Sequence, residues 1–221
     1  MNTIYYIGGS PCSGKSTVAE ILSKKYSLYY FKVDDFLEDY IKAGAFAGYP
    51  TCQKIVSMDA EQTWMRDPAG QCSEEFAFYK ETFEYLAKDL RQISYSGGIL
   101  TEGAAYVPAI MKQAGIPYNR YLSVTPTEQF QVFHYQKRAY VPFVLEGCLD
   151  KEKAFSNWME RDVLFAKEVR RQCVETAYAS IVNDGSMEID EMADKVAAHF
   201  GLGDDAGGRG AGLASCSDSK M

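Results

Sequence analysis

Five short hydrophobic runs are spread along the chain, and none of them alternates cleanly between apolar and polar residues. Continuous hydrophobicity of this kind is typical of parallel strands that helices cover on both faces. The five runs are Thr3–Ile7, Leu28–Val33, Gly98–Thr101, Arg120–Val124 and Ser180–Val182. We therefore expect five buried strands.

The segments between these runs carry hydrophobic residues at the helical spacing of three and four. The clearest stripes are Phe76, Tyr79, Phe83, Leu86 and Leu90, and then Ile189, Met192, Ala193, Val196, Ala197 and Phe200. A repeated order of strand and helix predicts an α/β fold with a doubly wound parallel sheet and helices on both of its faces. In such a sheet, ligands bind beyond the carboxyl ends of the strands.

Three helix starts carry capping signals. Residues 125–128 read Thr-Pro-Thr-Glu, which is a capping box with proline in the first helical position. Asp150 and Ser186 are suitable N-cap residues for the last two long helices. These signals fix where the predicted helices begin.

The sequence predicts one domain over residues 1–200 and a tail over residues 201–221. The tail is rich in glycine and small polar residues, and we expect it to be disordered. Glycine and proline interrupt residues 36–72, which we expect to form short helices and loops on the side of a phosphate acceptor. Residues 127–160 mix aromatic and basic residues and predict a helical lid.

A phosphate-binding motif follows the first predicted strand and precedes a helical pattern. It has the form G-x-x-x-x-G-K-[ST], and its residues are Gly9, Ser10, Pro11, Cys12, Ser13, Gly14, Lys15, Ser16 and Thr17. Strand, glycine-rich turn and helix in this order form a P-loop, whose backbone amides cradle phosphates. Lys15 is expected to reach the β/γ-phosphates of ATP, and the Ser16 hydroxyl to bind Mg²⁺. The alternative is an ordinary glycine-rich turn between a strand and a helix.

The composition of the chain argues against some classes of partner for this protein. The chain has 221 residues, of which 47% are hydrophobic and 24% charged, as is usual for a globular protein with one sizeable core. A net charge of −7 argues against a broad nucleic-acid-binding face. Six scattered cysteines, the lack of a targeting segment and the lack of a membrane-spanning run lead us to expect a cytoplasmic protein with no membrane partner.

Carboxylates follow two of the predicted strands. Asp34 and Asp35 lie at the end of the second strand, where a carboxylate can accept the proton of an attacking hydroxyl or hold Mg²⁺ through water. We assign Asp34 that role or a contact to the acceptor. Asp35 has a second interpretation, as the cap of a capping box with Glu38. Glu102 ends the third strand, at a position from which P-loop proteins hold the metal. Alternatively, Glu102 and Gly103 bind the acceptor, or Glu102 only bonds neighbouring amides.

Three arginines are candidates for contacts to anionic groups. Arg138 in the predicted lid and Arg161 in the following helix are expected to close over the transferring phosphate, whose charge needs cations. Arg66 is a candidate for binding an anionic acceptor, and its alternative is a pair with Asp67. Asp162 falls on the apolar stripe of its helix and needs a partner, which we expect to be a cation other than Arg161 because adjacent helical residues face different ways.

On these motifs, the chain resembles the small-molecule kinase branch of the P-loop NTPases. That branch includes nucleoside and nucleoside-monophosphate kinases, shikimate kinase, chloramphenicol phosphotransferase and the zeta-toxin kinases. Residues 33–36, Val-Asp-Asp-Phe, are similar to the end of the second strand in uridine kinase and chloramphenicol phosphotransferase. The resemblance implies that Asp34 is the base. It also implies a strand order of 2-3-1-4-5 and an adenine site near Asp184 and Gly185.

The sequence thus predicts an ATP- and Mg²⁺-dependent phosphotransferase that acts on a small hydroxylated metabolite, a nucleoside or a nucleotide. Two other functions compete with this one. A GTPase would need a guanine-reading Asn-Lys-x-Asp element, which the sequence lacks. A regulatory module that senses ATP without transferring phosphate remains the alternative.

Overall fold

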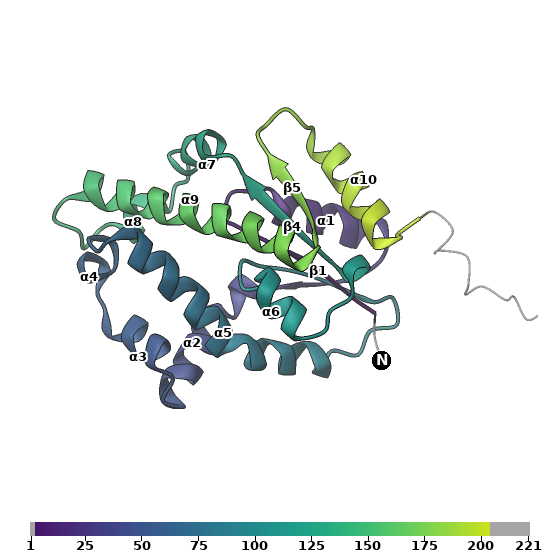
Figure 1. Cartoon of the computed structure of the whole chain (residues 1–221), viewed down its shortest axis with the longest axis horizontal. Coiled ribbons are helices and arrows are strands. Elements are labelled where there is room, and N and C mark those ends of the chain that lie inside the picture. Colours follow the sequence, from purple (N-terminus) through teal and green to yellow (C-terminus); the bar gives the residue numbers. More distant parts are fainter. Residues whose placement is uncertain (1–2, 204–221) are drawn as a thin grey trace, which may run out of the picture.

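A central sheet of five parallel strands organises the computed structural model, which describes residues 3–203 (Figure 1). The strand order is β2-β3-β1-β4-β5, so the predicted fold class and strand order are confirmed. The strands are β1 (Ile4–Gly9), β2 (Tyr29–Lys32), β3 (Ile99–Glu102), β4 (Tyr121–Pro126) and β5 (Ala179–Asn183).

Ten helices connect and cover these strands within residues 3–203. They are α1 (Lys15–Lys25), α2 (Leu37–Phe46), α3 (Pro50–Ser57), α4 (Ala60–Trp64), α5 (Pro68–Gln92), α6 (Pro108–Gln113), α7 (Glu128–Tyr135), α8 (Val141–Val144), α9 (Lys151–Thr176) and α10 (Ile189–Phe200). No helix in this range is both long and apolar enough to cross a lipid bilayer.

Each face of the sheet has its own hydrophobic core. On one face, α1 and α10 bury residues such as Leu22 and Phe200 against the strands. On the other face, α5 and α9 lie side by side across the sheet, with α6 beside them (Figure 1). The two predicted apolar stripes fall on α5 and α10, where they contribute buried residues such as Leu86 and Val196. Because both faces are covered, the strands do not need to alternate polar and apolar residues.

Four of the five strands reach further towards their carboxyl ends than the hydrophobic runs indicated, whereas β2 ends one residue earlier, at Lys32. β4 extends to Pro126, so Thr125 is buried inside the strand and does not cap a helix. The predicted capping box over residues 125–128 is therefore wrong by two residues, because Thr127 is the cap of α7 and accepts a hydrogen bond from Phe130 N. Asp150 caps α9 through a hydrogen bond from Lys153 N, as predicted.

Two other predicted boundaries need correction. Ser186 does not cap the last helix, since α10 begins at Ile189 and its N-cap residue is Glu188. Gly201 ends α10 with a φ of 68°, and Leu202 packs into the core, so both belong to the folded domain and not to the predicted tail. The rest of that tail, from residue 204 to residue 221, lies outside the described residues.

A third hydrophobic cluster joins the predicted acceptor segment to the predicted lid. The rings of Trp64 and Trp158 stack with their centroids 4.6 Å apart, and Tyr135 packs edge-on against Trp158. Cys12 of the P-loop and Val141 of α8 belong to the same cluster. The expected short helices within residues 36–72 are α2, α3 and α4, and the long helix α5 begins inside this range at Pro68.

Candidate functional site

The turn between β1 and α1 depends on two glycines. Gly9 has a φ of 121°, and a Cβ atom there would lie 1.8 Å from the carbonyl oxygen of Val124. Gly14 has a φ of 91° and directly precedes α1. Side chains are excluded by contact at the first position and by backbone conformation at the second, so the loop can close tightly at both ends.

No side chain within residues 3–203 caps the backbone N–H groups at the amino end of α1. The first turn of this helix contains no acidic residue either. The first turn of a helix leaves backbone N–H groups unpaired and carries a partial positive charge. Here both are available to an anion beside the P-loop, as the motif predicts.

Lys15 is buried at the start of α1, and its ammonium group stays inside the loop. Its Nζ donates a hydrogen bond of 3.2 Å to the Ser10 carbonyl oxygen. The same Nζ lies 4.0 Å from Glu102 Oε2. This position holds the cation next to the loop that would carry the phosphates.

Glu102 brings β3 into this site. Its carboxylate is fully buried, and Oε1 accepts hydrogen bonds of 3.0 Å from both the Ser16 and Tyr30 hydroxyl groups. Its Oε2 atom is buried and has no hydrogen-bond partner among residues 3–203. Ser16 and Glu102, which the sequence predicts as site residues, thus lie together in the structure.

These two oxygen-bearing side chains fit a magnesium ion. Mg²⁺ prefers oxygen ligands and usually takes one or two from the protein, with the rest from water and phosphate. The Ser16 hydroxyl and the carboxylate oxygen of Glu102 that accepts no hydrogen bond from residues 3–203 offer that donor set beside the predicted phosphate site.

Tyr30 was missed by sequence reasoning, because a tyrosine in a hydrophobic strand shows no chemical signal. Burial and the neighbouring Glu102 carboxylate raise the pKa of Tyr30 well above its usual value. The hydroxyl therefore stays protonated and acts as a hydrogen-bond donor to Glu102.

Asn183, at the end of β5, was also missed. Its Nδ2 donates a hydrogen bond of 3.0 Å to the Ser13 carbonyl oxygen, and its Oδ1 accepts one of 3.0 Å from Gly185 N. A single buried amide thus ties the P-loop to the loop after β5. No sequence motif marks such a residue.

A cavity of about 410 Å³ lies between the P-loop, α7 and the loop after β5. Gly185 and Arg138 line it together with Cys12 and Gly14, so four predicted site residues share one space. Its wall also includes the rings of Phe130 and His134, whose centroids are 4.1 Å apart; these two were not among the predicted site residues.

Asp184 takes a different position from Gly185. Its exposed carboxylate accepts hydrogen bonds from Ser186 N and Oγ, at 2.9 and 2.6 Å, and these bonds lower its pKa. Asp184 thus shapes the turn after β5. Ser186, predicted as a helix cap, instead donates to Asp184.

Asp34 and Asp35 lie in a 3₁₀ turn, Val33–Asp35, directly after β2. Both are exposed, and Asp35 pairs with Lys32 at 3.8 Å. The predicted capping box between Asp35 and Glu38 is wrong, because α2 begins at Leu37 behind an uncapped Phe36. The 3₁₀ turn places Asp35 one residue too early to reach the amides of α2.

Gly103, at the end of β3, packs against Val33, the residue that precedes Asp34. A Cβ atom at Gly103 would lie 2.7 Å from the Val33 Cβ atom, so the end of β3 packs directly on the turn after β2. Lys32 of β2 lies opposite Glu102 of β3 in the register of the two strands. Asp34 follows two residues after Lys32, at the same edge of the sheet. Gly103 therefore faces Val33 and not an open space.

Arg161 and Asp162 of α9 form a buried cluster with Glu75 of α5. Arg161 Nε lies 2.8 Å from Asp162 Oδ1 and 3.1 Å from Glu75 Oε2, and the guanidinium sits 4.9 Å from the Trp64 ring. The expectation that Asp162 pairs with a cation other than Arg161 is wrong. The flexible arginine side chain folds back along the helix to its own neighbour.

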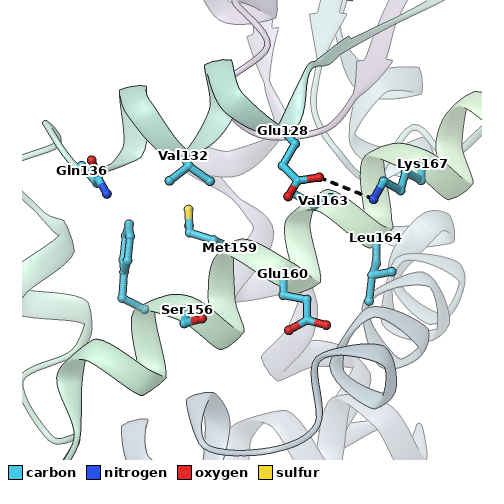
Figure 2. A pocket seen from close by; sticks show the side chains of 10 residues that line it. Glu128, Val132, Gln136, Ser156, Met159, Glu160, Val163, Leu164 and Lys167 are labelled. Carbon is cyan, nitrogen blue, oxygen red and sulfur yellow. Dashed lines mark ion pairs between the residues drawn. The ribbon is translucent and has the colours of Figure 1, made fainter.

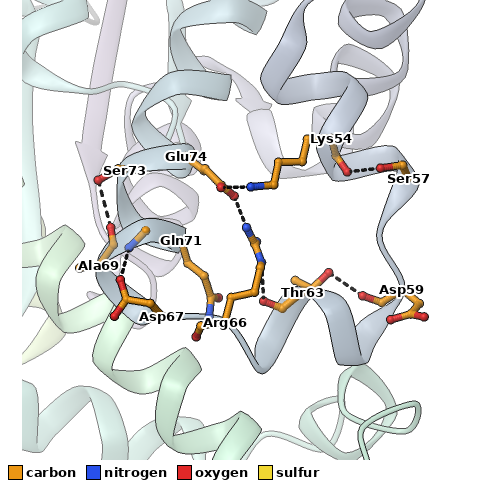
Figure 3. A network of polar contacts seen from close by, with 11 residues as sticks. Lys54, Ser57, Asp59, Thr63, Arg66, Asp67, Ala69, Gln71, Ser73 and Glu74 are labelled. Carbon is orange, nitrogen blue, oxygen red and sulfur yellow. Dashed lines mark hydrogen bonds and ion pairs between the residues drawn. The ribbon is translucent and has the colours of Figure 1, made fainter.

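Arg66 is held between α4 and α5 (Figure 3). Its guanidinium pairs with Glu74, which also pairs with Lys54, and its Nε donates to the Thr63 carbonyl oxygen. The alternative pair with Asp67 is wrong, since Asp67 caps α5 by accepting from Gly70 N.

A second cavity, of about 540 Å³, lies between α7 and α9 (Figure 2). Val132 and Met159 point towards each other across it, Val163 also lines it, and an ion pair of 3.6 Å between Glu128 and Lys167 lies at one end. None of the predicted site residues lines this cavity. Helix α7 thus has open space on two sides, one of which faces the P-loop.

No known protein family matches the sequence, and no curated protein is similar to it. Solved structures resemble the fold, including the following two. One is described as a "putative kinase" from Chloroflexus aurantiacus, with 14% identity and a TM-score of 0.42 over 90% of this chain and 98% of that chain. The other is from Thermus thermophilus, with 18% identity and a TM-score of 0.44 over the same shares, 90% and 98%. Likeness at this level carries no information about substrate or reaction.

Proposed function

We propose that the chain transfers the γ-phosphate of ATP to a hydroxyl or phosphate group of a small molecule. The observation that carries the proposal is the meeting of three groups at one edge of the sheet: the uncapped amino end of α1, the buried Lys15, and the Ser16–Glu102 pair. An anion-binding backbone, a cation and a metal-binding oxygen pair together suit a magnesium-bound triphosphate.

In this proposal the amides of the loop Gly9–Thr17 hold the phosphates, and Lys15 moves from the Ser10 carbonyl oxygen to a phosphate oxygen. Ser16 and Glu102 would hold Mg²⁺, which when bound neutralises the charge that develops on the phosphates. Tyr30 keeps the Glu102 carboxylate in place through its hydrogen bond.

Asp34 is the proposed base for a hydroxyl acceptor. It is exposed at the carboxyl edge of the sheet, and within residues 3–203 its side chain forms no hydrogen bond or ion pair. Asp34 would take the proton of the attacking hydroxyl as that oxygen bonds to the γ-phosphorus. The bond from the γ-phosphorus to the bridging oxygen breaks, and ADP leaves.

The cavity beside the P-loop is the proposed site of the nucleobase. The Phe130 and His134 rings supply a stacking surface, and Gly185 gives a close approach to the backbone. Arg138 lines the same cavity and is the better-placed cation to close over the phosphates. Arg161 remains a candidate for that role only if it leaves Glu75 and Asp162.

The alternative function is an ATP sensor without phosphoryl transfer. The two are separated by incubating the purified full chain with Mg²⁺, γ-labelled ATP and a panel of hydroxylated metabolites, nucleosides and nucleoside monophosphates. Transfer of label to one class of acceptor supports the proposed kinase. Tight ATP binding without transfer to any acceptor would instead favour the sensor.

A further inference from the structure

The negative charge of this protein is concentrated on one segment. Residues 34–75, which run from the proposed base to the first turns of α5, contain nine acidic and three basic residues, whereas the whole chain carries a net charge of −7. Almost all of the excess negative charge therefore lies on the side where the phosphate acceptor is expected.

The three basic residues of that segment are all neutralised. Lys42 pairs with Glu38, while Lys54 and Arg66 share Glu74. Arg161, which reaches this side from α9, meets both Glu75 and Asp162. An anionic acceptor would thus find each of these cations already paired with a carboxylate.

The buried cluster has more negative than positive groups. Arg161 is one cation between two carboxylates, and Asp162 Oδ2 is buried without a hydrogen-bond partner among the described residues. Glu75 Oε1 accepts from the Tyr79 hydroxyl, but its Oε2 has only the ion pair with Arg161, and no aligned hydrogen bond. Buried carboxylate oxygens without a donor are costly, so the cluster favours an added cation.

Asp162 and Asp34 are close enough to act electrostatically on the Glu75 carboxyl. Burial raises the pKa of the Glu75 carboxyl; Arg161 opposes the rise, and Asp162 and Asp34 add to it. Asp162 also contributes to the raised pKa of the Cys12 thiol in the P-loop, whose largest cause is burial. The cluster is therefore within electrostatic reach of both the proposed base and the phosphate loop, where an acceptor must lie.

We propose that the acceptor is a hydroxyl compound carrying a protonated amine, which Glu75 and Asp162 bind while Asp34 faces the hydroxyl group. This inference rests on the proposed kinase function and narrows it, because nucleoside monophosphates and hydroxy acids would be repelled. An ammonium group supplies a donor for Asp162 Oδ2 and an aligned donor for Glu75 Oε2, which has only its ion pair with Arg161. The Trp64 ring, which already faces the Arg161 guanidinium, adds an aromatic wall of the kind that cations favour.

The test compares three sets of acceptors with the full chain and MgATP: amino alcohols and aminocyclitols, neutral polyols and nucleosides, and hydroxy acids and nucleoside monophosphates. We expect the amines to have a kcat/KM at least about 10-fold above the other sets. Glu75→Gln and Asp162→Asn should each raise the KM for the best amine roughly 10- to 100-fold, the usual effect of losing a bond to a charged group. MgATP affinity, measured by calorimetry, should stay within about 2-fold.

Glu74→Gln is the matched control, because Glu74 is the adjacent carboxylate but pairs with Lys54 and Arg66. Its KM for the amine should change little. Thermal unfolding of each variant shows whether it is folded, and Glu75→Gln alone is sufficient if Asp162→Asn unfolds.

The preferred acceptor and the direction in which KM changes in Glu75→Gln show which acceptor charge the site binds. If a neutral or anionic acceptor is used best, or if KM falls in Glu75→Gln, the amine inference is overturned and the kinase proposal stands. If Glu75→Gln and Asp162→Asn are folded and neither changes the KM for the amine, the assignment of these two residues as its binding site is overturned. If MgATP binds but no acceptor of any set is phosphorylated, the proposed function itself fails.

Discussion

The Tyr30 hydroxyl donates a hydrogen bond of 3.0 Å to Glu102 Oε1, the same carboxylate oxygen that accepts a bond from the Ser16 hydroxyl. Residues from β2, β3 and α1 thus meet at one oxygen atom. This arrangement fixes the Glu102 carboxylate and leaves its second oxygen without a hydrogen-bond partner in the described part of the chain.

Tyr30→Phe removes one of these two donors without changing the shape of the side chain. We expect the magnesium concentration that gives half-maximal turnover to rise about 10-fold, as is usual when a partner of a metal ligand is lost. Tyr29→Phe is the control, because Tyr29 lies on the same strand but is exposed, and its ring packs against Tyr95. A magnesium titration of turnover checks the prediction, and equal midpoints for the two variants would contradict it.

Asp34→Asn should reduce phosphoryl transfer by about 10²–10⁴-fold, the usual contribution of a general base. Binding of ATP and the unfolding free energy should be preserved, because the Asp34 side chain is exposed. Asp35→Asn serves as the comparison, since Asp35 forms an exposed ion pair with Lys32. Single-turnover kinetics measure the step directly, and a larger loss in Asp35→Asn would exchange the two assignments.

Asn183→Ala breaks the link between the P-loop and the loop after β5. The Ser13 carbonyl oxygen and Gly185 N each lose their bond to this side chain, so the loop is held less rigidly. We expect the Kd for MgATP to rise by roughly 10-fold, which corresponds to about 1.4 kcal/mol. Fluorescence or calorimetric titration tests this, and an unaltered Kd would show that the amide does not organise the site.

Trp158→Ala should destabilise the region where α4, α7 and α9 meet. Trp158 is 5% exposed and stacks on Trp64, and removing a buried tryptophan side chain costs about 3–5 kcal/mol. Leu149→Ala is the control, because that side chain is 92% exposed. Denaturant unfolding of both variants compares them, and similar unfolding free energies would show that the stack contributes little.

The sequence predicts the tight turn between β1 and α1 well because the geometry of that turn is local. Gly9, Gly14, Lys15 and Ser16 lie within eight residues of one another, and the strand and helix on either side follow from hydrophobic spacing. The carboxylates at the ends of β2 and β3 are also recognisable, since neighbouring parallel strands end at the same edge.

Contacts between distant parts of the chain could not be predicted in this way. Tyr30 meets Glu102 across two strands, and Asn183 meets Ser13 across 170 residues, and neither belongs to a motif. The Arg161–Asp162 pair was missed for another reason. Cβ positions place adjacent helical residues on different faces, but an arginine side chain is long enough to turn back.

The central claim is that the P-loop binds a magnesium-bound purine triphosphate through its amides and Lys15. Calorimetric titration of ATP at millimolar Mg²⁺ into the wild-type chain and into Lys15→Ala tests it most directly. We expect a measurable heat of binding for the wild type and an affinity at least about 100-fold weaker for the variant, because the buried cation is lost. No heat with any purine triphosphate, or equal affinities for the two proteins, would contradict the account.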